Sequence, residues 1–192
     1  WDDIVAYAVD NGWHGAENLS LIPGEVGASA VQNIGAYGIE AKDLITKVEA
    51  VDIATGNVVE MTNEACKYAY RQSRFKNEWK DHYVIPHVTY CFSLNFCPDL
   101  DYGNIRHSLE EQGISKPTAQ QLRQTIINIR EAKLPDPKVM GNAGSFFMNP
   151  VVGRDVYERL AARYEGMPHY VVDAEHIKIP AGWMIEQCGW KG

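Results

Sequence analysis

Prolines and glycines interrupt the chain between residues 134 and 150. A single residue separates Pro135 from Pro137, and glycines follow at positions 141 and 144. Because proline lacks an amide hydrogen and glycine disfavours regular structure, a helix cannot run through this stretch. Ser145 lies between a glycine, which lets another backbone or a ligand approach, and two phenylalanines that exclude water. The stretch predicts either a tight loop in which Ser145 bonds the backbone or a site in which its hydroxyl takes part in chemistry.

Elsewhere, helical and strand patterns alternate. Asp2 or Asp3 is placed to cap a helix whose apolar positions share one face, and Thr118 with Gln121 makes a capping box that opens the clearest helix. Asp155 is expected to cap a further amphipathic helix. Residues 47–61 predict a β-hairpin around a Thr-Gly-Asn turn.

Mixed helices and strands predict an α+β fold. The proline pair is the expected domain boundary, with one domain over residues 1–134 and a smaller one over residues 135–192.

Small residues dominate residues 15–38, with isolated Ile, Val and Tyr between them. The segment is too rich in glycine for a stable helix and lacks the alternation of an ordinary strand. It is neither a P-loop nor a GxGxxG turn. It predicts either a connection inside a packed sheet or backbone that passes close to a flat ligand and offers amides to it.

Composition excludes several classes of function. A net charge of -7 without a basic stripe argues against a nucleic-acid partner, and no apolar run is long enough to cross a membrane. The four cysteines have no zinc-binding spacing, so no metal is expected. We expect a protein of the cytoplasm, and the absence of a starting methionine suggests an excised piece.

Three stretches together carry a family resemblance: residues 21–38, the Tyr-Arg-Gln-Ser-Arg-Phe-Lys run at 70–76, and residues 133–147. In this order they closely resemble the type I branch of the UDP-N-acetylenolpyruvoylglucosamine reductase (UDP-N-acetylmuramate dehydrogenase) family. The resemblance covers essentially the whole chain. It implies a middle fragment: part of an FAD-binding domain, then part of a substrate-binding domain, without the N-terminal segment or the C-terminal part that carries a catalytic glutamate.

The resemblance also implies an activity. Family members use FAD and NADPH to reduce the enolpyruvyl ether of UDP-N-acetylglucosamine to UDP-N-acetylmuramate in peptidoglycan synthesis. The fragment alone is expected to be inactive. By the match, Arg71 would stabilise negative charge on the substrate carboxylate and Ser145 would donate a proton.

The other site residues also come from the resemblance. Those that would hold the UDP-sugar are Tyr70, Tyr102, Lys133 and Asn149. Those that would contact the flavin are Pro23, Ala28, Val31, Ile34, Gly35 and Arg130. Ala28 stands where some relatives have a serine, which removes one expected contact. Lys133 and Arg130 also suit the C-terminal end of their helix without any ligand.

Two alternatives remain open at this point. One is another FAD oxidoreductase of the same wider fold, acting on a different alcohol or sugar. The other is a nucleotide-sugar binding module without catalysis. A serine hydrolase is disfavoured, because the residues around Ser145 do not form GxSxG.

Overall fold

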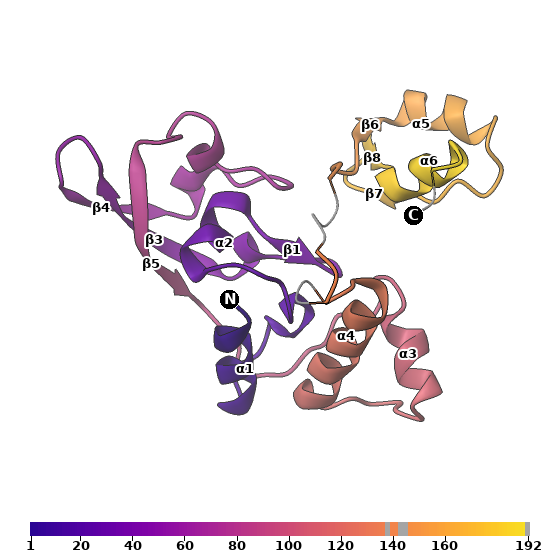
Figure 1. Ribbon diagram of the computed structural model, residues 1–192, viewed down its shortest axis with the longest axis horizontal. Helices are drawn as coiled ribbons and strands as arrows, with labels where there is room; N and C mark the ends of the chain where they lie inside the picture. The colour runs from indigo at the N-terminus through magenta and orange to yellow at the C-terminus, as the bar shows by residue number, and fades with distance from the viewer. Residues whose placement is uncertain (137–138, 142–145, 191–192) are drawn as a thin grey trace. The chain divides into compact units, whose positions relative to one another are not determined.

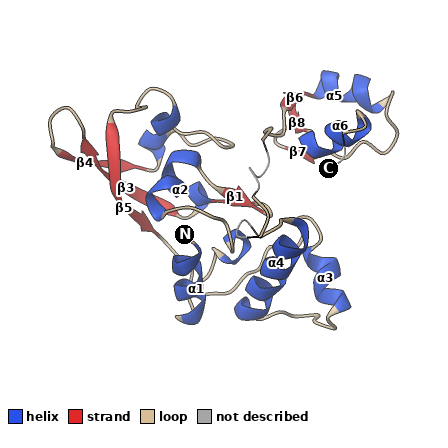
Figure 2. Ribbon diagram, in the orientation of Figure 1, coloured by secondary structure: helices blue, strands red, loops and turns tan. Residues whose placement is uncertain are grey.

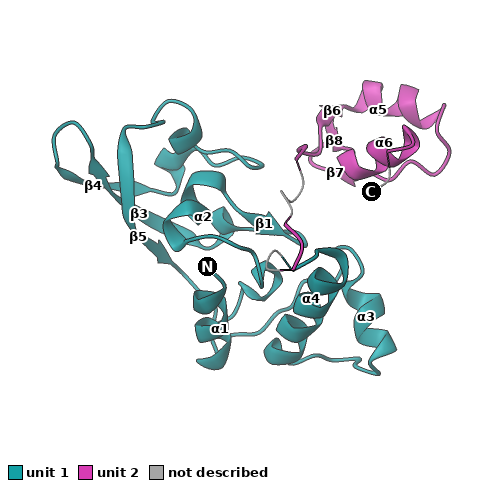
Figure 3. Cartoon of the chain, viewed as in Figure 1, with its two compact units in different colours: residues 1–136 teal, residues 137–192 magenta. Residues whose placement is uncertain are grey.

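The computed structural model describes residues 1–136, 139–141 and 146–190 of the 192-residue chain. It consists of two compact units, Trp1–Asp136 and Pro137–Gly192, each described by itself below (Figure 3). The division falls just beyond the domain boundary expected after residue 134. Both units contain helices and strands, so the predicted α+β class is confirmed (Figure 2).

The first unit combines a three-stranded antiparallel sheet, in the order β4-β3-β5, with helices and a two-stranded ribbon, β1-β2 (Figure 1). Its helices and strands are α1 (Asp2–Asp10), α2 (Val26–Gln32), β1 (Gly35–Ala36), β2 (Ile39–Glu40), β3 (Ile45–Asp52), β4 (Val58–Thr62), β5 (Tyr83–Tyr90), α3 (Ile105–Glu111) and α4 (Ala119–Lys133).

The predicted hairpin is present as β3 and β4, and β3 also pairs with β5. Register shifts along β3 change the plain two-residue alternation, so Ile45, Val48 and Ala50 all face the core. Met61 of β4 and Phe75 complete the same buried cluster. A second cluster of α3 and α4 side chains contains Ile105, Leu109, Leu122, Ile126 and Ile129.

The expectation that the glycine-rich segment contains no helix is wrong, because α2 lies within it. Tertiary packing supplies what the local sequence lacks. A Cβ atom on Gly27 would lie 2.8 Å from the carbonyl oxygen of Ile85, so this glycine lets α2 lie directly on β5. Ser29 fixes the contact, since its hydroxyl lies 2.5 Å from that of Tyr90.

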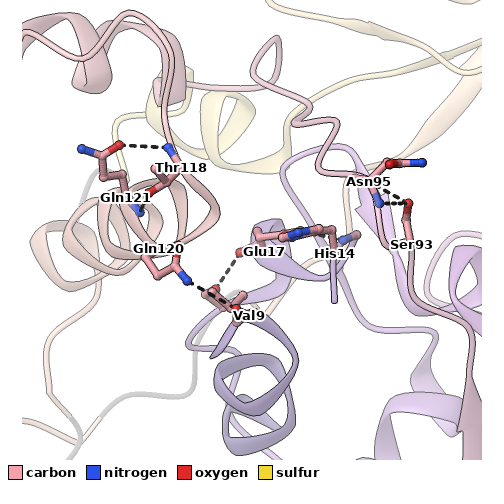
Figure 4. A network of polar contacts seen from close by, with 10 residues as sticks. Val9, His14, Glu17, Ser93, Asn95, Thr118, Gln120 and Gln121 are labelled. Atoms are coloured by element: carbon pink, nitrogen blue, oxygen red, sulfur yellow. Dashed lines mark hydrogen bonds and ion pairs between the residues drawn. The ribbon is translucent and has the colours of Figure 1, made fainter. Parts of the chain in front are cut away.

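The capping box of α4 is present as predicted: Gln121 N donates to Thr118 Oγ1, and Thr118 N donates to Gln121 Oε1 (Figure 4). In the same view, Gln120 Nε2 donates to the carbonyl oxygen of Val9 at 3.4 Å, which joins α4 to α1. The buried carboxylate of Glu17 also lies here, 2.9 Å from Nδ1 of His14.

The predicted cap of α1 by Asp2 or Asp3 is wrong, because Trp1 occupies the N-cap position. Asp2 binds other groups instead. The Asp2 carboxylate accepts two hydrogen bonds from the guanidinium of Arg123, at 2.9 and 2.8 Å, and one from the Leu21 amide at 2.6 Å. These bonds tie α1, α4 and the start of the glycine-rich segment together.

The second unit has a small antiparallel sheet in the order β6-β8-β7. Its elements are β6 (Val151–Gly153), α5 (Arg154–Ala161), β7 (Tyr170–Val171), β8 (His176–Lys178) and α6 (Ala181–Gln187). Ile177 and Ile179 are its most deeply buried side chains. The predicted cap of α5 is also wrong, because Gly153 rather than Asp155 occupies the N-cap position.

Over the described ranges of the chain, every helix is too short or too polar to span a lipid bilayer.

Asp2→Asn tests how strongly the ion pair with Arg123 stabilises the first unit. Burial alone would raise the pKa of Asp2, but the hydrogen bonds from Arg123 and the Leu21 amide outweigh it and hold the pKa below its usual value. The folded state therefore binds this proton more weakly than the unfolded state does. The stabilisation is complete above the unfolded pKa and is lost as pH falls through the folded pKa.

We expect Asp2→Asn to lower the free energy of unfolding at pH 7 by about 1–2 kcal/mol in urea titrations. The loss should vanish in acid, where the wild-type carboxylate is itself protonated. Asp101→Asn is the matched control, because Asp101 pairs with Arg106 on the exposed surface and should change little. Equal effects of the two variants would contradict this assignment.

Candidate functional site

Asn33 connects three parts of the first unit at the end of α2. Its side chain is fully buried and its φ of 48° is left-handed. Nδ2 donates to the Ala69 carbonyl oxygen and to Glu40 Oε2, both at 2.9 Å, while Oδ1 accepts from the Lys42 amide at 2.9 Å. The turn after α2 and the segment before Arg71 are therefore held by one amide group.

Arg71 lies directly against the glycine-rich segment. Its guanidinium donates to the carbonyl oxygen of Asn33 at 3.3 Å and to that of Gly35. A Cβ atom on Gly35 would lie 2.9 Å from Nη1 of Arg71 and 2.8 Å from the carbonyl oxygen of Ile39. Glycine is required at position 35 because a Cβ would meet the Ile39 backbone oxygen, and the absence of a side chain also leaves room for the guanidinium. The Tyr70 ring lies 5.2 Å from the Arg71 guanidinium carbon, a cation–π distance.

The loop around Arg71 has a fixed shape. Arg71 has a left-handed φ of 55°, which costs energy for a residue with a Cβ. Nζ of Lys76 donates to the Arg71 carbonyl oxygen at 2.9 Å, and the backbones of Ala69 and Gln72 exchange hydrogen bonds. The Ser73 hydroxyl donates to the carbonyl oxygen of Val31 at 2.6 Å. Several contacts thus hold a backbone conformation that the sequence alone disfavours.

The structure therefore brings Arg71 together with Val31, Ile34 and Gly35 of the predicted flavin set. Ile34 is half-buried and packs against the buried cluster of the three-stranded sheet and against a further buried cluster that contains Val5, Leu19 and Leu44. Ala28 is half-buried on α2, and Pro23 is exposed just before this helix.

Arg130 meets the same segment from α4. Its Nε donates to the carbonyl oxygen of Leu21 at 3.3 Å, and its guanidinium lies beside the Tyr37 hydroxyl. Burial raises the pKa of Tyr37, and the neighbouring Arg130 opposes this shift only in part. Tyr37 therefore stays a neutral hydrogen-bonding group at physiological pH.

Tyr102 lies beside the far end of the glycine-rich segment. A Cβ atom on Gly38 would lie 3.7 Å from the Cβ of Tyr102 and 3.0 Å from Asp99 Oδ2. Nδ2 of Asn18 joins the two backbones by donating to the carbonyl oxygens of Tyr37 and Asp99, at 2.8 and 3.1 Å. The predicted substrate residue Tyr102 and the predicted flavin segment are therefore neighbours.

The remaining predicted residues belong to other parts of the chain. Lys133 is exposed in the last turn of α4, one helical turn beyond Arg130. Asn149 belongs to the second unit, where its Oδ1 accepts from the Ala181 amide at 2.9 Å and so holds the start of α6. Ser145 lies outside the described residues.

Sequence reasoning missed Asn33 and Lys76. Asparagine is common in the left-handed position that ends a helix, which is the signal that could have found Asn33. The signal was lost because α2 itself was not expected. The bond from Lys76 to the Arg71 carbonyl oxygen depends on the loop shape and has no sequence pattern.

The residues present fit an FAD molecule. The first amides of α2 have no side-chain cap, so they can donate to a ligand. The place where a Cβ of Gly24 would lie has no atom within 4 Å, which leaves the backbone open to approach. These residues could hold the cofactor through backbone donors. No cluster of three or more metal-ligating side chains occurs in the part of the chain that the structure describes.

Comparisons with known proteins match both units. Residues 1–62 match the family model described as FAD binding domain, and residues 136–192 match the model of the UDP-N-acetylenolpyruvoylglucosamine reductase C-terminal domain.

Relatives match the whole chain. UDP-N-acetylenolpyruvoylglucosamine reductase of Bacteroides fragilis is 56% identical over 193 residues, covering 100% of this chain and 57% of the relative. The protein of the same name from Porphyromonas gingivalis is 51% identical, covering 100% of this chain and 56% of the relative. The chain thus spans somewhat more than half the length of these relatives.

Among solved structures, the crystal structure of UDP-N-acetylenolpyruvylglucosamine reductase from Thermus caldophilus matches with a TM-score of 0.51 at 20% identity, over 93% of this chain and 58% of that one. At this identity the match concerns the fold. Together these findings confirm the predicted family resemblance and the predicted FAD cofactor.

Gly35→Ala tests how closely the Ile39 carbonyl oxygen and the Arg71 guanidinium approach Gly35. The added methyl group would lie too close to the guanidinium and to the Ile39 carbonyl oxygen. We expect the free energy of unfolding to fall by about 1–3 kcal/mol in urea titrations. Gly182→Ala on α6 is the control, because a Cβ there meets no atom within 4 Å, and should be neutral or slightly stabilising. A neutral Gly35→Ala would show that the Ile39 carbonyl oxygen and the guanidinium do not approach Gly35 as closely as described.

Proposed function

This chain resembles part of UDP-N-acetylenolpyruvoylglucosamine reductase along its whole length, and on this premise we propose that the protein is an FAD-dependent oxidoreductase of peptidoglycan synthesis. It reduces the enolpyruvyl ether of UDP-N-acetylglucosamine to UDP-N-acetylmuramate, with NADPH as the source of electrons. We place it in the cytoplasm, where nucleotide sugars and NADPH are available, with a role in cell shape, cell division and the cell cycle through growth of the wall.

The observation that carries this proposal is the position of Arg71. Its guanidinium lies on the carbonyl oxygens of Asn33 and Gly35, and both residues belong to the region that matches the FAD binding domain model. A guanidinium has five N–H donors, so two carbonyl contacts leave others for a carboxylate. A fixed cation next to the flavin segment is what reduction of an unsaturated acid requires.

When bound, FAD supplies the hydride that adds to the vinyl carbon of the substrate. Negative charge then builds up on the adjacent carbon and its carboxylate, and Arg71 stabilises this charge with a planar pair of donors. The carbanion carbon needs a proton, and we assign its donation to Ser145. A free serine is a very weak acid, so this step requires close placement of the hydroxyl.

We assign binding of the UDP-sugar to Tyr70, Tyr102, Lys133 and Asn149. The assignment of Lys133 is supported by its exposure at the end of α4, where a diphosphate can reach its ammonium group. We assign contact with the flavin to Pro23, Ala28, Val31, Ile34 and Gly35, and to Arg130, whose Nε donates to the Leu21 carbonyl oxygen.

Arg71→Ala, in a protein of the relatives' full length that carries this sequence, tests the proposed reaction. Stopped-flow absorbance separates reduction of the flavin by NADPH from its reoxidation by the UDP-sugar substrate. We expect reoxidation to slow by about 10²–10³-fold, as for loss of one stabilising donor in other enzymes. Reduction by NADPH should stay nearly unchanged.

The matched control is Arg74→Ala, three residues further along the same loop, because Arg74 pairs with Glu78 and packs on Trp79 instead. It should leave both half-reactions near the wild-type rate. If Arg71→Ala slowed both half-reactions equally, the assignment of charge stabilisation to Arg71 would be wrong. If the UDP-sugar does not reoxidise the reduced flavin of the wild-type protein, the proposed function is overturned. Such a result would favour another oxidoreductase or a binding module.

Lys133→Ala tests the assigned diphosphate contact. Loss of a charge-assisted hydrogen bond should weaken binding of the UDP-sugar by about 1–3 kcal/mol in calorimetric titration. Lys116→Ala removes an exposed cation that precedes α4 and should leave the affinity unchanged. If both variants bind equally well, Lys133 serves only the end of its helix.

A further inference from the structure

We propose that Asn33 is a positioning residue for Arg71, which sets both the backbone and the guanidinium of this arginine for the reduction step. The inference rests on the proposed function, because Arg71 must first be the charge-stabilising residue.

Asn33 contacts the Arg71 region at two separate points. Its side-chain Nδ2 donates to the carbonyl oxygen of Ala69 at 2.9 Å, two residues before Arg71. Its backbone carbonyl oxygen accepts from Nη1 of Arg71 at 3.3 Å. Asn33 thus fixes both the backbone that precedes Arg71 and the position of the Arg71 guanidinium.

The position of Asn33 is itself strongly determined. Its side chain is fully buried, and its three side-chain hydrogen bonds go to two separate segments: to Glu40 and the Lys42 amide, and to the Ala69 carbonyl oxygen. A buried amide that loses such partners pays a desolvation cost, so Asn33 keeps one orientation. That orientation passes to Arg71 through the contacts above.

The chemistry of this position requires asparagine. The side chain must donate to Glu40 and to the Ala69 carbonyl oxygen, and it must accept from the Lys42 amide. Aspartate would set a second carboxylate against that of Glu40, whose charge is partly balanced by Lys42 Nζ at 3.2 Å. Glycine keeps the left-handed backbone but makes none of the side-chain bonds.

The experiment uses Asn33→Gly in the full-length reductase, alone and combined with Arg71→Ala. We expect Asn33→Gly to slow flavin reoxidation by substrate by about tenfold or more while reduction by NADPH stays near the wild-type rate. The double variant should be no slower than Arg71→Ala alone, within about twofold, because both changes remove the same effect. If Asn33→Gly does not fold, Asn33→Asp combined with Glu40→Gln takes its place, because this pair keeps the bond to the Lys42 amide, avoids two opposed carboxylates and still removes the donor to Ala69.

Asn63→Ala is the matched control. Nδ2 of Asn63 also donates to two backbone carbonyl oxygens, those of Lys42 and Ile45 at 2.8 and 2.7 Å, and neither of these partners belongs to the loop of Arg71. It should leave flavin reoxidation unchanged.

Amide hydrogen exchange gives a readout that is independent of turnover. Asn33→Gly should speed exchange at the Ala69 and Gln72 amides, and Asn63→Ala should not. Faster exchange throughout the β3–β4 hairpin would indicate general destabilisation and would overturn the inference. Multiplicative slowing in the double variant would overturn it too. If Arg71→Ala alone leaves reoxidation at the wild-type rate, the assignment of Arg71 within the proposed function fails instead.

Discussion

The buried side-chain amide of Asn33 is the contact on which the site depends. Its three partners come from β2, from the turn after β2 and from the loop that carries Arg71. In a water-free interior these bonds must be present together, because each one left unmade would cost more than it contributes when formed. The end of α2 and the loop of Arg71 therefore adopt their geometry jointly.

The start of the glycine-rich segment is held by charged side chains from outside it. The Asp2 carboxylate accepts a hydrogen bond from the Leu21 amide while it pairs with Arg123, and Arg130 Nε donates to the Leu21 carbonyl oxygen. Both arginines belong to α4, so a well-formed helix orients a segment with little structural preference of its own. This arrangement suits a ligand-binding backbone, which must be open to the ligand and still have one conformation.

Local patterns predicted the elements whose stability is local. The capping box of Thr118 and the β3–β4 hairpin are signals of this kind. The helix α2 was not predictable, because it depends on the close approach of Gly27 to Ile85. The cap assigned to Asp2 failed for a similar reason: an aspartate that pairs with a distant arginine looks, in sequence, like one that caps a helix.

The site shows the same division. The family resemblance indicated Arg71 and the residues near it that are predicted to contact the flavin. The role of Asn33 became visible only through its contacts in space.

The close approach of the Ile39 carbonyl oxygen to Gly35 has a consequence for how the two positions 35 and 71 can evolve. This oxygen belongs to the backbone, so it excludes a Cβ at position 35 whatever side chain is present at position 71. Loss of the arginine would therefore not open position 35 to larger residues. A lineage that no longer needed the cation would be free to change Arg71 while Gly35 stayed fixed.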